Sequence, residues 1–207
     1  NFGDLKIAWT WDSIDSDITE LRSQRRRGFG SPLIATPIMA DGKLYISTAF
    51  SQVAAMDAGT GEMLWKYDSG SWRKGRPANM GFRHRGVSYW KDGDDERIIV
   101  GTGHSRLIAL DAKTGNVVWE TEVQDSAAGY SKTAAPLIVG DKVFTGVAGG
   151  EYGIRGLIDA YNLNTGAREW RFNTTPSPDH PDNRTWSGDS WRTGGAATWM
   201  TGSYDPE

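Results

Sequence analysis

One eleven-residue pattern occurs three times in this chain and limits its fold more than any other feature. The pattern is Ala-x-Asp/Asn-x-x-Thr-Gly-x-x-x-Trp, and its copies end at Trp65, Trp119 and Trp170. The tryptophans are 54 and 51 residues apart. A period of about 50 residues is typical of propellers and solenoids, in which each repeat is one supersecondary unit.

Each copy of the pattern predicts a hairpin of two strands. The Asp or Asn opens a turn, the Thr-Gly pair closes it with glycine at positive φ, and the tryptophan lies on the returning strand. A second hairpin precedes each copy, and the first of these has an Asp-Gly turn between apolar stretches, which is the strongest short hairpin signal. Two hairpins make a four-stranded antiparallel sheet. Since no apolar pattern of period 3.6 persists, we predict an all-β propeller without long helices.

The predicted blades cover roughly residues 30–70, 80–122 and 131–172. Residues 173–194 are rich in Pro, Asp and Ser and are predicted to form a long loop over one face, and residues 195–207 to start the next blade. A closed propeller needs at least four blades, so we expect the chain to be part of a larger propeller. The repeated tryptophans are expected to be core residues packed against the neighbouring blade.

Composition excludes several classes of function. The 207 residues contain no cysteine, which excludes disulfides, zinc–thiolate sites and cysteine nucleophiles. The net charge of −3 argues against a nucleic-acid partner, which would need a clustered basic face. The one basic run, at residues 22–28, is interpreted as a solvated loop. His84, His104 and His180 do not have metal-ligand spacing.

Two further stretches point to a family. Together with the repeats, GGEYGIRG at residues 149–156 and TGGAATWMTGSYDP at residues 193–206 resemble the N-terminal part of the pyrroloquinoline quinone-dependent alcohol dehydrogenases. The tryptophan repeat also occurs in non-catalytic propellers, whereas these two stretches are specific to the enzymes. The resemblance spans nearly all of the chain and implies an eight-bladed propeller, of which the chain holds about three blades.

The resemblance implies a quinone at the propeller axis with a calcium ion coordinated to it. Glu151 matches a ligand of that ion, and a carboxylate suits a hard cation. Gly149 and Gly150, directly before it, would let the flat cofactor approach the backbone. Calcium takes about 6–8 oxygen ligands, so the others are expected from the quinone and from residues beyond position 207.

Four more positions match cofactor-binding residues of the family. Arg85 corresponds to an arginine that pairs with the acidic edge of the cofactor, a task that suits the planar guanidinium. Considered without the resemblance, Arg85 would be interpreted as part of an inter-blade salt bridge. Thr133 and Thr198 match threonines that hydrogen-bond cofactor oxygens, and Trp199 matches the floor under the quinone ring.

The chain departs from the family pattern in two places. Asn79 and Met80 stand where the methanol and ethanol enzymes carry two adjacent, bridged cysteines against the ring. Met80, Phe82 or His84 could cover the ring instead. Ala148 replaces a serine of the better-known alcohol enzymes, which removes one cofactor hydrogen bond worth about 1 kcal/mol.

The implied function is oxidation of an alcohol, sugar or polyol hydroxyl by hydride transfer to calcium-bound quinone in the periplasm. The electron acceptor would be a cytochrome c or a quinone. The catalytic base of the family is an aspartate in a later blade, and Asp189 and Asp205 are interpreted as structural residues in turns.

The alternative is a non-catalytic propeller that serves as a scaffold for protein docking. The enzyme is favoured because a scaffold has no need of Glu151, Arg85 and Trp199 at its axis. We therefore expect the side chains of the site to converge at one end of the axis; these are Arg85, Thr133, Glu151, Thr198 and Trp199.

Overall fold

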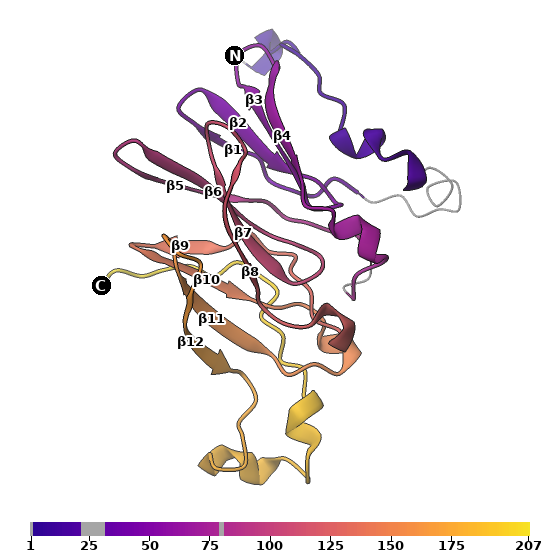
Figure 1. Cartoon of the computed structure of the whole chain (residues 1–207), viewed down its shortest axis with the longest axis vertical. Helices are drawn as coiled ribbons and strands as arrows, with labels where there is room; N and C mark the ends of the chain where they lie inside the picture. Colours follow the sequence, from indigo (N-terminus) through magenta and orange to yellow (C-terminus); the bar gives the residue numbers. More distant parts are fainter. Residues whose placement is uncertain (1, 22–31, 79–80) are drawn as a thin grey trace.

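The computed structural model describes residues 2–21, 32–78 and 81–207, and the basic run at 22–28 lies outside them. Within these residues, the strands form three antiparallel sheets of four strands, each in chain order (Figure 1). The first blade contains β1 (Ile38–Ala40), β2 (Lys43–Ser47), β3 (Gln52–Asp57) and β4 (Met63–Asp68). The second contains β5 (Ser88–Asp92), β6 (Asp95–Gly101), β7 (Arg106–Asp111) and β8 (Val117–Glu122). The third contains β9 (Leu137–Val139), β10 (Lys142–Gly146), β11 (Leu157–Asn162) and β12 (Arg168–Asn173).

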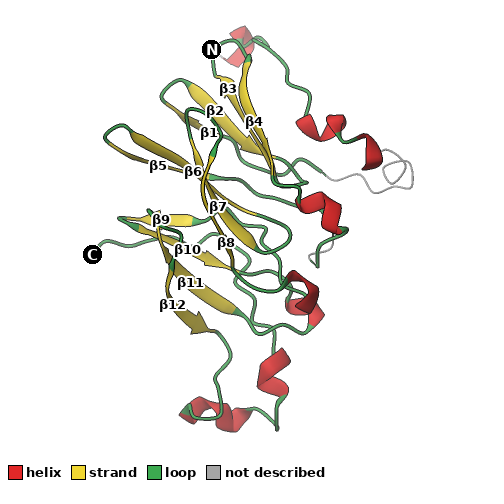
Figure 2. Cartoon of the chain, in the orientation of Figure 1, coloured by secondary structure: helices red, strands yellow, loops and turns green. Residues whose placement is uncertain are grey.

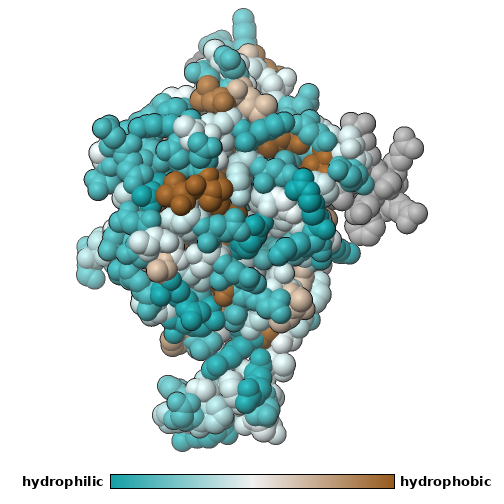
Figure 3. All heavy atoms as spheres, viewed as in Figure 1, coloured by the Kyte–Doolittle hydropathy of each residue, from teal (hydrophilic) through white to brown (hydrophobic). Residues whose placement is uncertain are grey.

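The helices of the described residues are all short 3-10 turns (Figure 2). They are η1 (Phe2–Asp4), η2 (Ile14–Asp17), η3 (Thr19–Leu21), η4 (Ser71–Lys74), η5 (Ser126–Ala128), η6 (Gly150–Tyr152), η7 (Pro181–Thr185) and η8 (Ser190–Thr193). Among the described residues, none of these helices is long and apolar enough to cross a membrane. The face drawn in Figure 3 is largely hydrophilic, with small separate hydrophobic patches. The predicted all-β class with four-stranded antiparallel blades is confirmed.

The turn of each repeat is built by its Asp or Asn side chain. One carboxylate oxygen of Asp57 accepts bonds from the N–H of Gly59 at 2.9 Å and from the N–H and hydroxyl of Thr60 at 2.8 and 3.0 Å. Asp111 and Asn162 accept the equivalent bonds in the other two copies. An amide serves as well as a carboxylate because the turn needs only an acceptor oxygen.

Each seam between consecutive blades is closed by a repeat tryptophan. Trp65 of the first blade donates its indole N–H to the carbonyl of Ala112 at 3.0 Å, and its ring lies on Gly115. Trp119 repeats the arrangement one blade later on Gly166. A Cβ at either glycine would lie 2.6 Å from the indole, so the seam requires glycine at both places. The predicted packing of these two tryptophans is confirmed.

A tryptophan outside the three repeats forms a seam contact of the same kind. Trp9 donates its N–H to the carbonyl of Ala58 at 3.1 Å and covers Gly61, as the repeat tryptophans do one blade later.

The predicted burial of the tryptophan fails for the last repeat. Trp170 was expected in the core, but 43% of its surface is exposed. The reason is that the glycine partner of a seam tryptophan comes from the blade that follows it. No strand follows β12 among the residues that the structure describes.

The segments that lead into successive blades bind one another near the axis, where β1 contacts β5 and β5 contacts β9. The N–H of Thr36 donates to the carbonyl of Arg85 at 3.0 Å, and the N–H of Arg85 donates to the carbonyl of Thr133 at 2.9 Å. The hydroxyl of Thr133 donates to the carbonyl of Trp199 at 3.3 Å. Backbone bonds therefore join the first three segments in series, and a side-chain bond adds the segment of Trp199.

Their chain neighbours face the opposite way, into the ends of the blades. The ring Nε2 of His84 bonds the carbonyl of Gly101 at 2.6 Å, and Nζ of Lys132 donates to the carbonyl of Gly146 at 2.7 Å. Thr198, the neighbour of Trp199, also turns toward a blade, and its hydroxyl donates to a carbonyl of β11. Side chains of an extended backbone alternate between two sides. One position of each segment therefore faces the axis, and the position next to it faces the end of a blade.

Gly115→Ala is expected to destabilise the protein more than Gly42→Ala. Both glycines have φ of +74°, so both alanines meet the same left-handed strain of about 1–2 kcal/mol. At Gly42 a Cβ would meet nothing within 4 Å, whereas at Gly115 it overlaps Trp65, which adds about 1–3 kcal/mol. Urea denaturation measures the two free energies of unfolding. Equal losses would mean that the seam does not depend on this contact.

Lys132→Met is expected to change how stability depends on pH. Burial lowers the pKa of Lys132 from its ordinary value of 10.5 to about 7. Between these values the unfolded chain binds more protons than the folded one, so the free energy of unfolding rises with pH by at most about 1.4 kcal/mol per pH unit. Below pH 7 Lys132 is protonated in the folded chain, so the folded state bears the full free-energy cost of burying the charge.

Methionine removes this titration, so the variant should be more stable than wild type at or below pH 7 and should lack that rise. Urea denaturation from about pH 6 to about pH 9.5 measures the difference. Lys66→Met, at a site where half of the side chain is exposed, controls for the loss of one positive charge. Parallel pH profiles for wild type and Lys132→Met would contradict the prediction.

Candidate functional site

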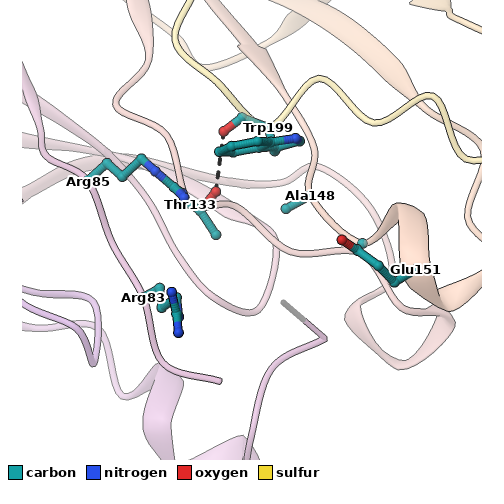
Figure 4. A pocket seen from close by; sticks show the side chains of 7 residues that line it. Arg83, Arg85, Thr133, Ala148, Glu151 and Trp199 are labelled. Atoms are coloured by element: carbon teal, nitrogen blue, oxygen red, sulfur yellow. Dashed lines mark hydrogen bonds between the residues drawn. The ribbon is translucent and has the colours of Figure 1, made fainter. Parts of the chain in front are cut away.

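A cavity of about 160 Å³ opens where the axial residues meet (Figure 4). Its walls come from the segments that enter the second and third blades, from the loop after β10, and from the chain beyond η8. The residues that line it are Arg83, Arg85, Thr133, Ala148, Gly149, Glu151 and Trp199. Four of the five side chains expected to converge are thus brought together from distant parts of the chain.

Trp199 presents an aromatic face to the cavity. The guanidinium carbon of Arg85 lies 4.7 Å from the centroid of its ring, within the range of a cation–π contact. The backbone carbonyl of Trp199 accepts the Thr133 hydroxyl, which fixes this wall to the segment entering the third blade (Figure 4). Trp199 is still 44% exposed, so part of the residue remains accessible to a ligand.

Arg85 carries a positive charge for which the described residues provide no counterion. Its Nη1 is buried without a hydrogen-bond partner. Burial, and then the nearby charge of Arg83, lower the pKa of Arg85. The alternative of an inter-blade salt bridge finds no carboxylate partner in the part of the chain that the structure describes. A buried donor left without an acceptor is unfavourable, so the group is suited to an anionic ligand.

Glu151 projects toward the cavity from η6, opposite the arginines (Figure 4). The glycine before this helix is required by the chain itself, because a Cβ at Gly149 would lie 2.0 Å from the carbonyl oxygen of Gly129. Gly149 lines the cavity and has φ of +119°, a conformation that favours glycine. Gly150 does not line the cavity, contrary to its expected place beside the cofactor.

Thr198 also lies away from the cavity wall. Its hydroxyl accepts the N–H of Val147 at 3.3 Å and donates to Leu157, so it joins β11 to the loop after β10. The expectation that it faces a cofactor with Thr133 and Trp199 is therefore not met in this structure. The physical reason is the alternation of the segment, in which Trp199 faces the axis and its neighbour faces the blade.

Two of the three residues proposed to replace the paired cysteines, Phe82 and His84, do not line the cavity. His84 is 1% exposed and lies between the blades, where Nδ1 contacts the Ser47 hydroxyl at 2.7 Å. Burial lowers the pKa of His84 to about 4, so it is a neutral structural side chain. Phe82 packs on Phe50, with ring centroids 4.5 Å apart. Asn79 and Met80 lie outside the described residues.

Arg83 is a lining residue that sequence reasoning missed. It lies two positions before Arg85 in the same extended segment, and positions two apart share a side of such a segment. This two-residue alternation is the sequence signal that could have identified Arg83 as a neighbour of Arg85 in the cavity. Ala148, which the resemblance aligns with a serine of the better-known alcohol enzymes, lines the cavity as well.

The cavity does not hold a complete set of metal ligands. Glu151 is the only carboxylate among its described lining residues. In the same described part of the chain, no three His, Asp or Glu side chains form a group that could hold a metal. Glu151 could therefore supply part of a coordination shell whose other oxygens come from a ligand or from other chain segments.

Comparison with known proteins identifies the family of the chain. Residues 1–207 match the family model described as PQQ, the β-propeller domain of glucose, ethanol and alcohol dehydrogenases. The quinohemoprotein alcohol dehydrogenase ADH IIB of Pseudomonas putida is 43% identical over 187 residues, which cover 84% of this chain and 26% of that protein.

Solved structures show the same relationship. The quinohemoprotein alcohol dehydrogenase ADHIIG of Pseudomonas putida HK5 superposes with a TM-score of 0.75 at 37% identity, covering 85% of this chain and 27% of that one. A europium-containing methanol dehydrogenase gives a TM-score of 0.71 at 31% identity, covering 82% of this chain and 33% of that one. The chain thus spans about a quarter to a third of the relatives it matches. Because the family model matches its whole length, the chain belongs to the PQQ β-propeller family of glucose, ethanol and alcohol dehydrogenases.

Proposed function

We propose that this chain forms the cofactor-holding part of a quinoprotein dehydrogenase that oxidises an alcohol, sugar or polyol hydroxyl. The observation that carries the proposal is the buried Nη1 of Arg85, which has no partner and lies beside the exposed face of Trp199. A flat, anionic quinone satisfies both features. The relatives are alcohol and methanol dehydrogenases, so the alternative of a docking scaffold is not favoured.

The chemistry of the lining residues supports pyrroloquinoline quinone as the ligand. Arg85 would bind a carboxylate of the cofactor through charge-assisted hydrogen bonds. Trp199 would stack under the ring, and the Thr133 hydroxyl would donate to a ring oxygen in exchange for its bond to the Trp199 carbonyl. Gly149 leaves the backbone of that wall without a side chain. When bound, the quinone supplies the redox chemistry that amino-acid side chains lack.

Glu151 would hold a metal ion next to the quinone. Its carboxylate is a hard oxygen donor, which suits calcium and would suit the europium of the related methanol dehydrogenase on the same grounds. We propose calcium. The metal would add Lewis-acid polarisation, while the role of this chain is to fix the carboxylate opposite the arginines.

The proton-accepting group is proposed to come from another part of the enzyme. Asp189 and Asp205 are both exposed and neither lines the cavity, which supports their interpretation as structural residues. We further propose a periplasmic location and an electron acceptor of the cytochrome c or quinone type, as the family resemblance implies.

Arg85→Gln in the complete enzyme is expected to weaken quinone binding by about tenfold to a hundredfold, because one charge-assisted contact is lost. Stability without cofactor should change little, since the substitution removes a partly buried charge that has no counterion and loses one cation–π contact with Trp199. Quenching of tryptophan fluorescence by added quinone measures the affinity, and thermal unfolding measures stability. An unstable cofactor-free variant with normal quinone affinity would assign Arg85 a structural role.

Glu151→Gln is expected to weaken calcium binding in the complete enzyme by at least about tenfold, because the amide keeps the shape but loses the charge. Dehydrogenase activity should fall and recover partly at high calcium. Isothermal titration with calcium, and separately with europium, measures metal affinity in the presence of quinone. Glu62→Gln, at an exposed position, is the matched control. Unchanged metal affinity for Glu151→Gln would refute the proposed ligand.

A further inference from the structure

We propose that Arg83 forms a second anion-binding subsite of the cavity, at its open side, and that it binds a carboxylate. The proposal rests on the proposed function, because it concerns the same cavity. Arg83 and Arg85 lie two residues apart on one extended segment and line the same cavity (Figure 4). Arg85 points toward Thr133 and Trp199, whereas Arg83 is exposed, so the two guanidinium groups serve different parts of the cavity.

The charges of the cavity are unbalanced. Two arginines face one carboxylate, that of Glu151, among the described lining residues. Arg83 makes no hydrogen bond, ion pair or ring contact with any residue that the structure describes. The positive charge of Arg83 also acts on Arg85, which is itself partly buried. Like charges that line one cavity repel each other, and an anion bound at Arg83 relieves this repulsion.

The geometry of the guanidinium specifies the chemical class of this anion. A planar fork of N–H donors matches the two oxygens of a carboxylate. The carboxylate has two possible sources. One is a second carboxylate of the quinone, in which case Arg83 and Arg85 together anchor the cofactor. The other is the substrate, in which case Arg83 makes the enzyme prefer hydroxy acids to neutral alcohols of the same length.

Binding measurements on the complete enzyme distinguish the two sources without relying on turnover. Fluorescence quenching gives the dissociation constant of pyrroloquinoline quinone for wild type, Arg83→Gln and Arg83→Lys. The quinone-loaded proteins are then titrated with 6-hydroxyhexanoate and with neutral 1,6-hexanediol. Arg184→Gln, an exposed arginine on η7 outside the cavity lining, removes the same charge elsewhere.

Arg83→Gln is expected to weaken one of the two anionic ligands by about fivefold, the scale of an ion pair open to solvent. Weaker quinone binding assigns the subsite to the cofactor; weaker 6-hydroxyhexanoate binding with an unchanged diol assigns it to the substrate. Arg83→Lys should retain part of the affinity because it keeps the charge. No effect on either anionic ligand, or an equal effect of Arg184→Gln, overturns the proposal. Wild-type enzyme that binds no quinone would instead refute the proposed function.

Discussion

The contact between an indole ring and a glycine of the next blade is the constraint on which the rest of this structure depends. Trp65 and Trp119 each cover a glycine whose Cβ would lie 2.6 Å from the ring, and each donates its N–H to a carbonyl of the following blade. The contact combines a large apolar area with one directional bond, so it fixes both the distance and the angle between sheets. Small errors in that angle would separate the segments at the axis.

The axial segments convert this packing into a functional site. Their backbones bond to one another from Thr36 to Arg85 and from Arg85 to Thr133, and the Thr133 hydroxyl continues the series to Trp199. Because extended chain alternates, the same segments build the cavity with one set of side chains and close the blade ends with the other. His84 and Lys132 belong to the second set and are almost fully buried. Substitutions there should act on the cavity through stability and position.

The cavity itself combines features that are unfavourable without a ligand. Arg85 has a buried nitrogen without an acceptor, Arg83 adds a like charge, and Trp199 exposes an aromatic face. A protein that folded only for stability would gain by removing each of them. Their presence together in one cavity supports the proposed flat, anionic ligand.

The sequence by itself determined the blades, because the features that build them are local. The Asp or Asn turn, the Asp-Gly hairpin and the repeated tryptophan all act within a few residues or at one fixed period, so a single chain reveals them. The family resemblance also pointed to Arg85, Thr133, Glu151 and Trp199, which the structure places around one cavity.

Only the tertiary structure decided which side chains face that cavity. Thr198 and Trp199 are adjacent in sequence, as are His84 and Arg85, and each pair divides between the blade and the axis. The phase of that alternation is set by hydrogen bonds to segments about 50 residues away, which a local pattern cannot show. The missing counterion of Arg85 and the exposure of Trp170 are likewise properties of neighbours distant in sequence, since burial and charge balance arise only when separate segments meet.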